Sequence, residues 1–381
     1  MPSSNPENIL VRGVNWLGDA VMTTPALLRL REAHPGARIT LLTPGKLKDI
    51  WLGHPAVDAV KTFKLEASPF GIGRGLRREN FDLAVVLPNS PRSALEMWIA
   101  GIARRVGYAQ PWRNMFLTDA IPPRPGAVVM HKRSVAEINR LNQQGAANIR
   151  PPASAHHLHH YLHLIAAVGG KAEPLSPQLV VMESAVAQFT AKFNLGASST
   201  VPWFGLNPGA EYGPAKRWPE ERFIEAAIQI QRRVKCRWLI FGLASDGELA
   251  ARMAAKISQA AEGQFSSEEL NNTPAVTNLA GATSLGELCA ALRLCRVLLT
   301  NDSGPMHVAA ALGTPVVVPF GSTSPELTGP GLPGDPRHRL LRTNAPCSPC
   351  FRRECPIDFR CMNGISVEQL VTAFLASIHC H

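Results

Sequence analysis

Short apolar runs alternate with amphipathic stretches from close to the start of the chain. Residues 8–14 (NILVRGV), 38–42 (RITLL) and 81–87 (FDLAVVL) are dominated by branched apolar side chains. Runs of this length are typical of strands that are buried on both faces of a parallel sheet. Residues 19–33 instead repeat apolar side chains every three or four positions, which predicts a helix. Strands that alternate with helices indicate an α/β fold with doubly wound parallel sheets.

A second series of the same kind begins after residues 192–202 (KFNLGASSTVP), whose small and turn-forming side chains predict an interdomain linker. Before it, the pattern loosens between about residues 107 and 152, where we expect loops and a lone helix near Ser134. The second series predicts strands at residues 203–207, 237–241, 277–279, 297–300 and 315–320, separated by helices at residues 220–233, 247–260, 284–294 and 306–312.

The chain is therefore expected to contain two doubly wound, Rossmann-like domains. We place the first at residues 1–192 and the second at residues 200–361, followed by a final segment, residues 362–381, that contains an apolar helix. Two such domains facing each other would line a central cleft with the carboxyl ends of their strands, where doubly wound sheets bind ligands.

The charge balance changes the picture of what the chain binds. It has 39 Lys and Arg against 29 Asp and Glu, a formal net charge of +10, which favours an anionic partner such as a nucleic acid, an anionic lipid or a phosphorylated sugar. Aromatic residues make up only 6% and the basic residues are scattered, so a nucleic-acid groove is the least favoured of the three. A generically basic surface is the alternative. We find neither an apolar run long enough to span a membrane nor a signal-peptide pattern, so a cytosolic protein is expected.

The most specific stretch is residues 299–321, in which a strand is followed by a short turn and a helix. Asp302 or Ser303 can cap that helix, and Gly304 lets the backbone approach a ligand closely. The N–H groups at the start of a helix suit a diphosphate, and His307 lies within the first turn. An ordinary capped helix is the competing interpretation.

Two further stretches follow strands in the same way. Residues 206–219 carry two glycines and a basic pair, in which Lys216 could bind a phosphate; a basic surface loop is the alternative. Residues 13–24 place Asp19 at the start of a helix, at the mouth of the first sheet. Asp19 could accept a proton from an incoming hydroxyl group as a general base, or it could simply cap the helix.

Taken together, these stretches resemble the family 9 glycosyltransferases, the ADP-heptose:lipopolysaccharide heptosyltransferases, and within them the type II enzymes that add the second heptose. The resemblance is carried by WLGDAVMTTPAL, VLPNSPRSAL, LNPGAEYGPAKRWP and TNDSGPMHVAAALGTPVV, which occur in the family's order and span most of the chain. It implies a GT-B fold, with an acceptor-binding first domain, a nucleotide-sugar-binding second domain and a last helix that crosses back to the first domain.

The resemblance also implies roles for single residues. Asp19 matches the family's proposed general base and Lys216 its phosphate-binding lysine. The donor loop corresponds to Asp302, Ser303, Gly304 and His307, and the turn that contains Asp246 corresponds to the nucleoside region, where relatives often carry a glutamate. The implied reaction is an inverting transfer by a single displacement. No Asp-x-Asp metal motif occurs, so we expect no cofactor in catalysis and expect the lysine, the histidine and the helix start to stabilise the departing ADP.

The implied partners are an ADP-heptose donor and the phosphorylated inner core of lipid A that bears a first heptose. Arg92, Arg104 and Arg105 lie near the matched first-domain block and could bind its acidic groups, or be exposed arginines without a role. An anionic glycolipid acceptor predicts peripheral contact with the inner face of the inner membrane, and no nucleic acid. The competing functions are a GT-B transferase or epimerase using another nucleotide sugar, and a non-catalytic protein that binds a nucleotide sugar or lipid A.

Two clusters stay open at this point. Cys347, Cys350, Cys355 and Cys361 are spaced closely enough to hold structural zinc or an iron–sulfur cluster, and reduced thiols or local disulfides are the alternative. The run HHLHHYLH, residues 156–163, contains histidine pairs four positions apart that could bind zinc. We expect instead a solvated or cleft-facing helix.

Overall fold

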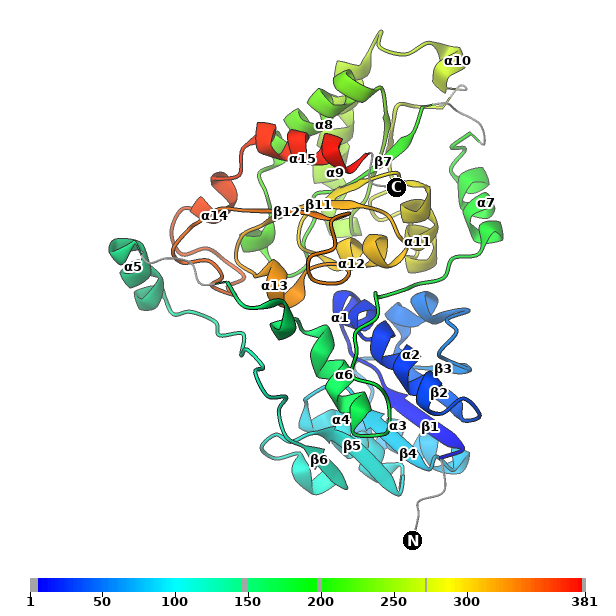
Figure 1. The fold of residues 1–381 in the computed structure, drawn as a ribbon. Helices are drawn as coiled ribbons and strands as arrows, with labels where there is room; N and C mark the ends of the chain where they lie inside the picture. Colours follow the sequence, from blue (N-terminus) through cyan, green and yellow to red (C-terminus); the bar gives the residue numbers. More distant parts are fainter. Residues whose placement is uncertain (1–5, 146–149, 197–200, 271–272, 379–381) are drawn as a thin grey trace. The chain divides into compact units, whose positions relative to one another are not determined.

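The computed structural model describes residues 6–145, 150–196, 201–270 and 273–378 of the chain. It separates into two compact units (Figure 1). The first unit is Met1–Val128 with Ser154–Val180, and the second is Val129–Ala153 with Val181–His381. The expected boundary near residue 192 therefore shifts, and residues 129–153, expected in the first domain, belong to the second unit. Residues 197–200 of the expected linker lie outside the described residues.

The first unit is built on a six-stranded parallel sheet in the order β3-β2-β1-β4-β5-β6. Apolar runs form its centre as predicted, whereas β3, β5 and β6 have half-exposed side chains and carry no apolar run for a sequence pattern to show. The strands are β1 Asn8–Arg12, β2 Arg38–Pro44, β3 Ala59–Phe63, β4 Leu83–Val86, β5 Arg104–Tyr108 and β6 Asp119–Ile121, and the helices are α1 Leu17–Met22, α2 Thr24–Ala33, α3 Pro69–Leu76, α4 Pro91–Ile99 and α6 Leu158–Ala166.

The second unit is built on another six-stranded parallel sheet, in the order β12-β11-β10-β7-β8-β9. Its strands are β7 Trp203–Asn207, β8 Arg237–Ile240, β9 Val276–Asn278, β10 Leu298–Thr300, β11 Val316–Phe320 and β12 Arg339–Arg342. Its helices are α5 Val135–Gln144, α7 Glu183–Lys192, α8 Glu220–Val234, α9 Gly247–Ala261, α10 Ser267–Leu270, α11 Leu285–Leu294, α12 Gly304–Ala311, α13 Pro325–Thr328, α14 Arg360–Asn363 and α15 Val367–Ser377. The edge strand β12 is the one that the sequence pattern missed.

Strand order reverses at one place in each sheet. In the first sheet the chain builds outward from β1 through β2 to β3, and then from β4 to β6 on the other side; in the second sheet the reversal lies between β7 and β10. The connections on either side of such a reversal leave opposite faces of the sheet, so a crevice opens at the carboxyl ends of the two strands. The segments after β1 and β10 therefore begin at these two crevices.

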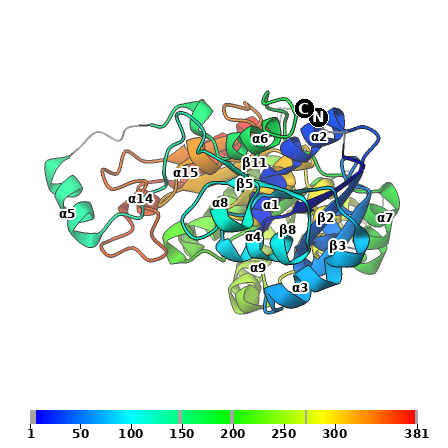
Figure 2. The same cartoon turned by 90° about the horizontal axis from the view of Figure 1, so that it is seen from below.

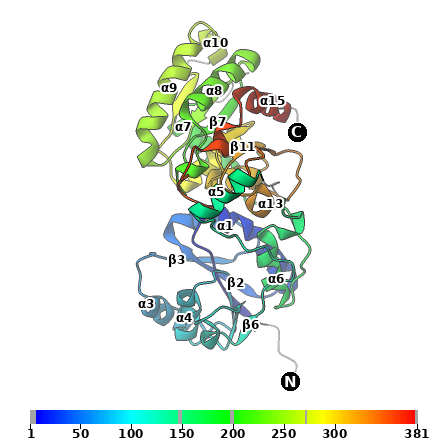
Figure 3. The same cartoon turned by 90° about the vertical axis from the view of Figure 1, so that its left-hand side faces the viewer.

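The last helix corrects one expectation. α15 does not cross back to the first unit; it packs against α8, within the second unit, as Figures 1 and 3 both show. Leu370, Val371 and Phe374 are fully buried, and the Phe374 ring lies 5.0 Å from that of Phe204 in β7. Burying each such side chain stabilises the fold by about 1.5–3 kcal/mol. The apolar face of α15 is therefore part of the hydrophobic core of the second unit, together with α8 and β7.

A segment expected in the first domain, as loops with a lone helix near Ser134, belongs to the second unit, and that helix is α5. Residues 129–153 carry α5 to the second unit, where Ile138 packs on Cys347 and Cys350, and Figure 2 shows α5 beside the loops that precede α14. Among the described residues, no helix has the length and apolar character needed to cross a membrane.

Candidate active site

Two asparagines join the loops that follow β7 and β10 in the second unit. Asn207, the last residue of β7, donates from Nδ2 to Thr300 Oγ1 (3.0 Å) and to Ser303 Oγ (3.1 Å). Asn301 donates from Nδ2 to the Pro208 carbonyl oxygen (2.7 Å). Both asparagine side chains are buried, so these bonds hold the two loops in fixed register at the crevice of the sheet. Sequence reasoning missed both residues; the signal available was an asparagine that follows an apolar strand in each loop.

An ion pair brings together two of the predicted donor-binding residues. Lys216 Nζ lies 2.6 Å from Asp302 Oδ2, and the side chains are 14% and 4% exposed. The hydroxyl group of Thr323 donates to the same carboxylate oxygen, and Lys216 Nζ also lies 4.9 Å from the centre of the Tyr212 ring. The Lys216 ammonium group is thus held in place, and the Asp302 carboxylate partly balances its charge.

The start of α12 differs from the expectation that Asp302 or Ser303 caps it. Ser303 is the N-cap residue, but its side chain makes no capping hydrogen bond, because its hydroxyl group is held by Asn207. Asp302 is held by Lys216 and Thr323. At the start of this eight-residue helix the Gly304 N–H therefore has no side-chain cap and can bind a phosphate oxygen, whereas Pro305 has no N–H and the Met306 N–H donates to the Ser303 carbonyl oxygen (3.1 Å).

His307 lies on the first turn of α12 and is buried. Burial lowers its pKa to about 4, and Lys216 acts in the same direction, while the nearby Asp302 raises it. His307 is therefore neutral at pH 7 and can serve an anion only through an uncharged ring N–H group. His307 was expected to stabilise the departing diphosphate electrostatically. A neutral ring limits that role to a hydrogen bond.

Asp246 lies after β8, at the same edge of the sheet. One carboxylate oxygen accepts the N–H of Leu243 (3.0 Å), the other lies 3.7 Å from Arg217, and the side chain is buried. A Cβ atom on Gly209 would come within 2.6 Å of this carboxylate, so the loop before Lys216 needs a glycine there. Asp246 thus braces the Lys216 loop, and its contact with a nucleoside stays a prediction.

In the first unit, Asp19 lies in the first turn of α1, just after β1 and at the crevice of that sheet. Trp16 is the N-cap residue, so Asp19 does not occupy the N-cap position that was its alternative. Tyr161 of α6 is fully enclosed; burial raises its pKa well above 10, and the charge of Asp19 raises it further. Asp19 therefore stands near a neutral phenol at the edge of the sheet where ligands bind.

The three arginines predicted to bind the acceptor lie at opposite edges of the first sheet. Arg92 begins α4, after β4, on the same edge of the sheet as Asp19, and it pairs with Glu96 (3.2 Å). Arg104 and Arg105 begin β5 and so lie at the opposite edge, because all the strands are parallel. Arg105 donates from Nε to the Phe116 carbonyl oxygen (2.8 Å), a bond that holds the chain after β5. The structure does not bring these two residues to the crevice.

A further arginine at the crevice escaped the sequence analysis. Arg113 is fully buried and donates from Nη1 to the carbonyl oxygen of Pro88 (2.9 Å), just after β4. Its Nε and Nη2 atoms have no hydrogen-bond partner among the described residues, and burial lowers the pKa of the guanidinium to about 10. Arg113 lies in the stretch between about residues 107 and 152, where the hydrophobic pattern is weak. Its positive charge was therefore the only sequence signal for a functional role.

The histidine run packs as part of the first unit. Tyr108 donates its hydroxyl hydrogen to the carbonyl oxygen of His160 (2.7 Å) and lies 2.9 Å from His163 Nδ1, while the ring of His157 stacks on that of Tyr161. Burial lowers the pKa of His160 to about 4. These histidines therefore act as neutral packing groups, and no metal-ligand group is found among the described residues.

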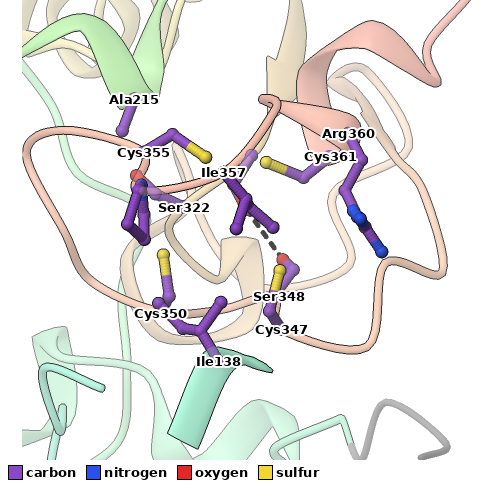
Figure 4. A pocket seen from close by; sticks show the side chains of 12 residues that line it. Ile138, Ala215, Ser322, Cys347, Ser348, Cys350, Cys355, Ile357, Arg360 and Cys361 are labelled. Atoms are coloured by element: carbon purple, nitrogen blue, oxygen red, sulfur yellow. Dashed lines mark hydrogen bonds between the residues drawn. The ribbon is translucent and has the colours of Figure 1, made fainter. Parts of the chain in front are cut away.

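The cysteine segment lies in the second unit (Figure 4). Cys347, Cys350 and Cys361 are buried and Cys355 is partly exposed, and the described cysteines are all free, so the local disulfides that the sequence left open are not formed. Burial raises the pKa of Cys361 to about 12. Burial also raises the pKa of Cys347 and Cys350, so these three buried side chains are neutral thiols rather than nucleophiles.

Comparison with known proteins places this arrangement in a family. Residues 129–359 match the model of "Glycosyltransferase family 9 (heptosyltransferase)". Lipopolysaccharide heptosyltransferase 2 of Salmonella typhimurium is 32% identical over 84% of this chain and 85% of its own, and its Escherichia coli counterpart is 31% identical with the same coverage. The solved structure of E. coli ADP-heptose LPS heptosyltransferase II is 27% identical and has a TM-score of 0.73, covering 97% of this chain and 98% of its own.

The expected fold class is confirmed, because this chain is built on two parallel sheets with flanking helices and matches the heptosyltransferase structures in fold over nearly its whole length. These relatives also confirm the sequence resemblance as a whole, over most of both chains. The ion pair at the crevice of the second sheet and the half-buried carboxylate at that of the first are thus parts of a glycosyl-transferring enzyme: the chain belongs to glycosyltransferase family 9, the heptosyltransferases.

Proposed function

We propose that this protein transfers heptose from ADP-L-glycero-β-D-manno-heptose to the first heptose of the lipopolysaccharide inner core, with inversion at the anomeric carbon. The observation that carries the donor assignment is the Lys216–Asp302 pair, which stands beside an α12 start without a side-chain cap. Lysine and backbone N–H groups bind a diphosphate, and a carboxylate beside them can accept hydrogen bonds from sugar hydroxyl groups. The names of the relatives support this choice of sugar and acceptor.

The proposed reaction is a single displacement. The acceptor hydroxyl oxygen forms a bond to the anomeric carbon while the bond from that carbon to the β-phosphate oxygen breaks, and the hydroxyl proton passes to the carboxylate of Asp19. ADP leaves with the bonding electron pair. Lys216 and the Gly304 N–H at the start of α12 stabilise the negative charge that it gathers, and His307 contributes an uncharged N–H. Each step uses side-chain and backbone groups of the chain itself, so we propose that the transfer needs no cofactor.

The acceptor side of the proposal rests on charge. Arg92 and Arg113 lie at the carboxyl edge of the first sheet, with Asp19, and could bind phosphate groups of an inner core. An acceptor anchored in lipid A requires the enzyme to work at a membrane surface. We therefore propose a cytoplasmic protein that contacts the inner face of the inner membrane peripherally, with the net charge of +10 favouring anionic headgroups and no nucleic-acid partner.

The test is a donor panel. The full chain is incubated with inner-core acceptor bearing one heptose and, in turn, with ADP-heptose, ADP-mannose and UDP-sugars, and the products are read by mass spectrometry. We expect a mass increase of one heptose with ADP-heptose. Transfer from a UDP-sugar alone would overturn the donor assignment. Binding of ADP-heptose without any transfer to acceptors that carry the first heptose would favour a binding protein instead.

A further inference from the structure

Four cysteine side chains from one short segment meet at the same small cavity of the second unit. Cys347, Cys350, Cys355 and Cys361 all line it, together with Ile138 of α5. Figure 4 shows the sulfur atoms turned toward the space that the four side chains enclose. In sequence the cysteines are separated by two, four and five residues, so a single loop brings all of them to one point.

The surroundings of the cavity suit thiolates. The backbone N–H of Phe359 donates to Cys355 Sγ (3.3 Å), a bond of the kind that orients metal-bound sulfur. Arg360 lines the cavity, and Arg133 donates its backbone N–H to the Cys350 carbonyl oxygen (3.0 Å), which brings a second basic residue to the segment. Four thiolates around a divalent ion carry a net charge of about −2, which neighbouring guanidinium groups stabilise.

The cavity between the cysteines is about the size of one ion. Its volume is about 10 Å³, which is room for about one water-sized particle and so suits a single ion. Zinc takes four ligands in a tetrahedron and readily accepts four thiolates. We propose that Cys347, Cys350, Cys355 and Cys361 bind one zinc ion. Among the described residues no group of three His, Cys, Asp or Glu side chains is close enough to hold a metal ion as it stands, so binding requires the four sulfur atoms to move closer together.

The cysteine segment, residues 347–361, is bonded to the two loops that carry Lys216 and Thr323, and these bonds indicate the role of the ion. On one side, Phe351 accepts the hydroxyl hydrogen of Tyr212 at its carbonyl oxygen (2.8 Å), and Arg353 accepts the N–H of Ala215 (2.9 Å), next to Lys216. On the other side, Ser348 Oγ donates to the Gly321 carbonyl oxygen (2.7 Å), two residues before the Thr323 that binds Asp302. The ion therefore fixes a segment that is bonded to Ala215, the neighbour of Lys216, and to Gly321, two residues before Thr323, and its role is structural.

Metal content tests the proposal without any activity measurement. The untagged full chain, purified without chelator, is analysed for zinc and iron by plasma mass spectrometry, and a sample is reduced, supplied with zinc and desalted. We expect stoichiometric zinc, and we expect cobalt substituted for zinc to show thiolate-to-cobalt charge-transfer absorption together with the visible bands of a tetrahedral site. No stoichiometric zinc in either sample overturns the proposal, and stoichiometric iron overturns the choice of zinc.

Two variants locate the ligands. Cys350→Ser should lose the zinc, whereas Cys236→Ala, which changes a buried cysteine of the core packed around α8 and α15, should keep it. If Cys350→Ser folds poorly, the cobalt spectrum of the unaltered chain still reports whether sulfur atoms bind the ion. Zinc retained in full by Cys350→Ser, or a cobalt spectrum without thiolate charge transfer, contradicts the four-cysteine site.

Discussion

Lys216 and Asp302 form an ion pair that spans the two loops at the crevice of the second sheet, with 2.6 Å between Nζ and Oδ2. They are 86 positions apart in the chain and are brought together because β7 and β10 are neighbours in the sheet. Both side chains are largely shielded from water. The pair therefore fixes the cation of the proposed donor site and also makes the stability of that site depend on both residues.

Removing one partner of this pair should destabilise the second unit. Lys216→Met leaves the Asp302 carboxylate buried without its cation, which costs up to about 3–5 kcal/mol for a buried pair. Adding Asp302→Asn removes the stranded charge and should restore most of the stability, but not ADP binding. Urea denaturation and calorimetric titration with ADP separate the two effects. Lys192→Met, which breaks an exposed pair with Glu287, is the control and should change stability by less than about 1 kcal/mol.

Asp19→Asn should abolish the proposed proton transfer without affecting the donor. Removing a general base lowers turnover by about 100-fold or more, while ADP affinity, which we assign to the second unit, should stay unchanged. Turnover is measured with ADP-heptose and heptosylated acceptor, and ADP binding by calorimetry. Asp119→Asn, at the amino end of β6, is the matched control and should retain activity. Full turnover in Asp19→Asn would remove Asp19 from the mechanism.

Gly213→Ala should destabilise the Lys216 loop. Gly213 has a φ of +146°, and a Cβ atom there would lie 2.6 Å from the Arg353 carbonyl oxygen, which cannot withdraw as a flexible side chain can. We expect a loss of about 1–3 kcal/mol in the free energy of unfolding, and weaker ADP binding. Gly247→Ala, at the start of α9 with open space around its Cβ, should be neutral or stabilise by up to about 1 kcal/mol. Equal losses in the two variants would contradict this account.

Acid should destabilise the second unit through its buried histidines. Burial lowers the pKa of His338 and of His307 to about 4, below the value near 6.5 of an unfolded chain. Between these values the unfolded state binds more protons, so stability is complete above about pH 6.5 and falls as the pH drops toward 4. His338→Gln should weaken this dependence, measured as the change in urea midpoint between pH 7 and pH 5.

The control for this experiment is His131→Gln, because the His131 side chain is 71% exposed and its replacement changes no buried group. It should leave the pH dependence of stability unchanged. If His338→Gln and His131→Gln both lose as much stability between pH 7 and pH 5 as the unaltered chain, groups other than His338 cause the pH dependence.

Much of the fold could be predicted from local pattern. Apolar runs such as residues 8–14 and 81–87 became β1 and β4, and each run of the second series became a strand of its sheet. The missing strands, β3, β5, β6 and β12, lie on the outer side of each sheet, where half-exposed positions accept polar side chains. Their existence depends on a neighbouring strand with free backbone groups, which no local window contains.

For the candidate site, residue types were predictable but partners were not. Lys216, Asp302, Ser303 and His307 were chosen because they follow strands, and the structure does gather them at one crevice. The capping role expected of Ser303 was wrong because Asn207, which is remote in the chain, holds the hydroxyl group. Arg104 and Arg105 were close in sequence to the right block yet lie at the wrong end of their strand.

The sequence alone determined where backbone elements begin and end and which segments carry chemistry, because hydrophobic period, turn residues and strand-to-helix junctions are local properties. Tertiary structure decided that α15 packs beside α8 rather than in the first unit, that Asp246 lies against Gly209 and Arg217 of the Lys216 loop, and that four thiols share one cavity. Those outcomes depend on which distant surfaces fit when apolar area is buried and buried polar groups find partners. That choice is made by the whole packed unit, not by any stretch of the chain.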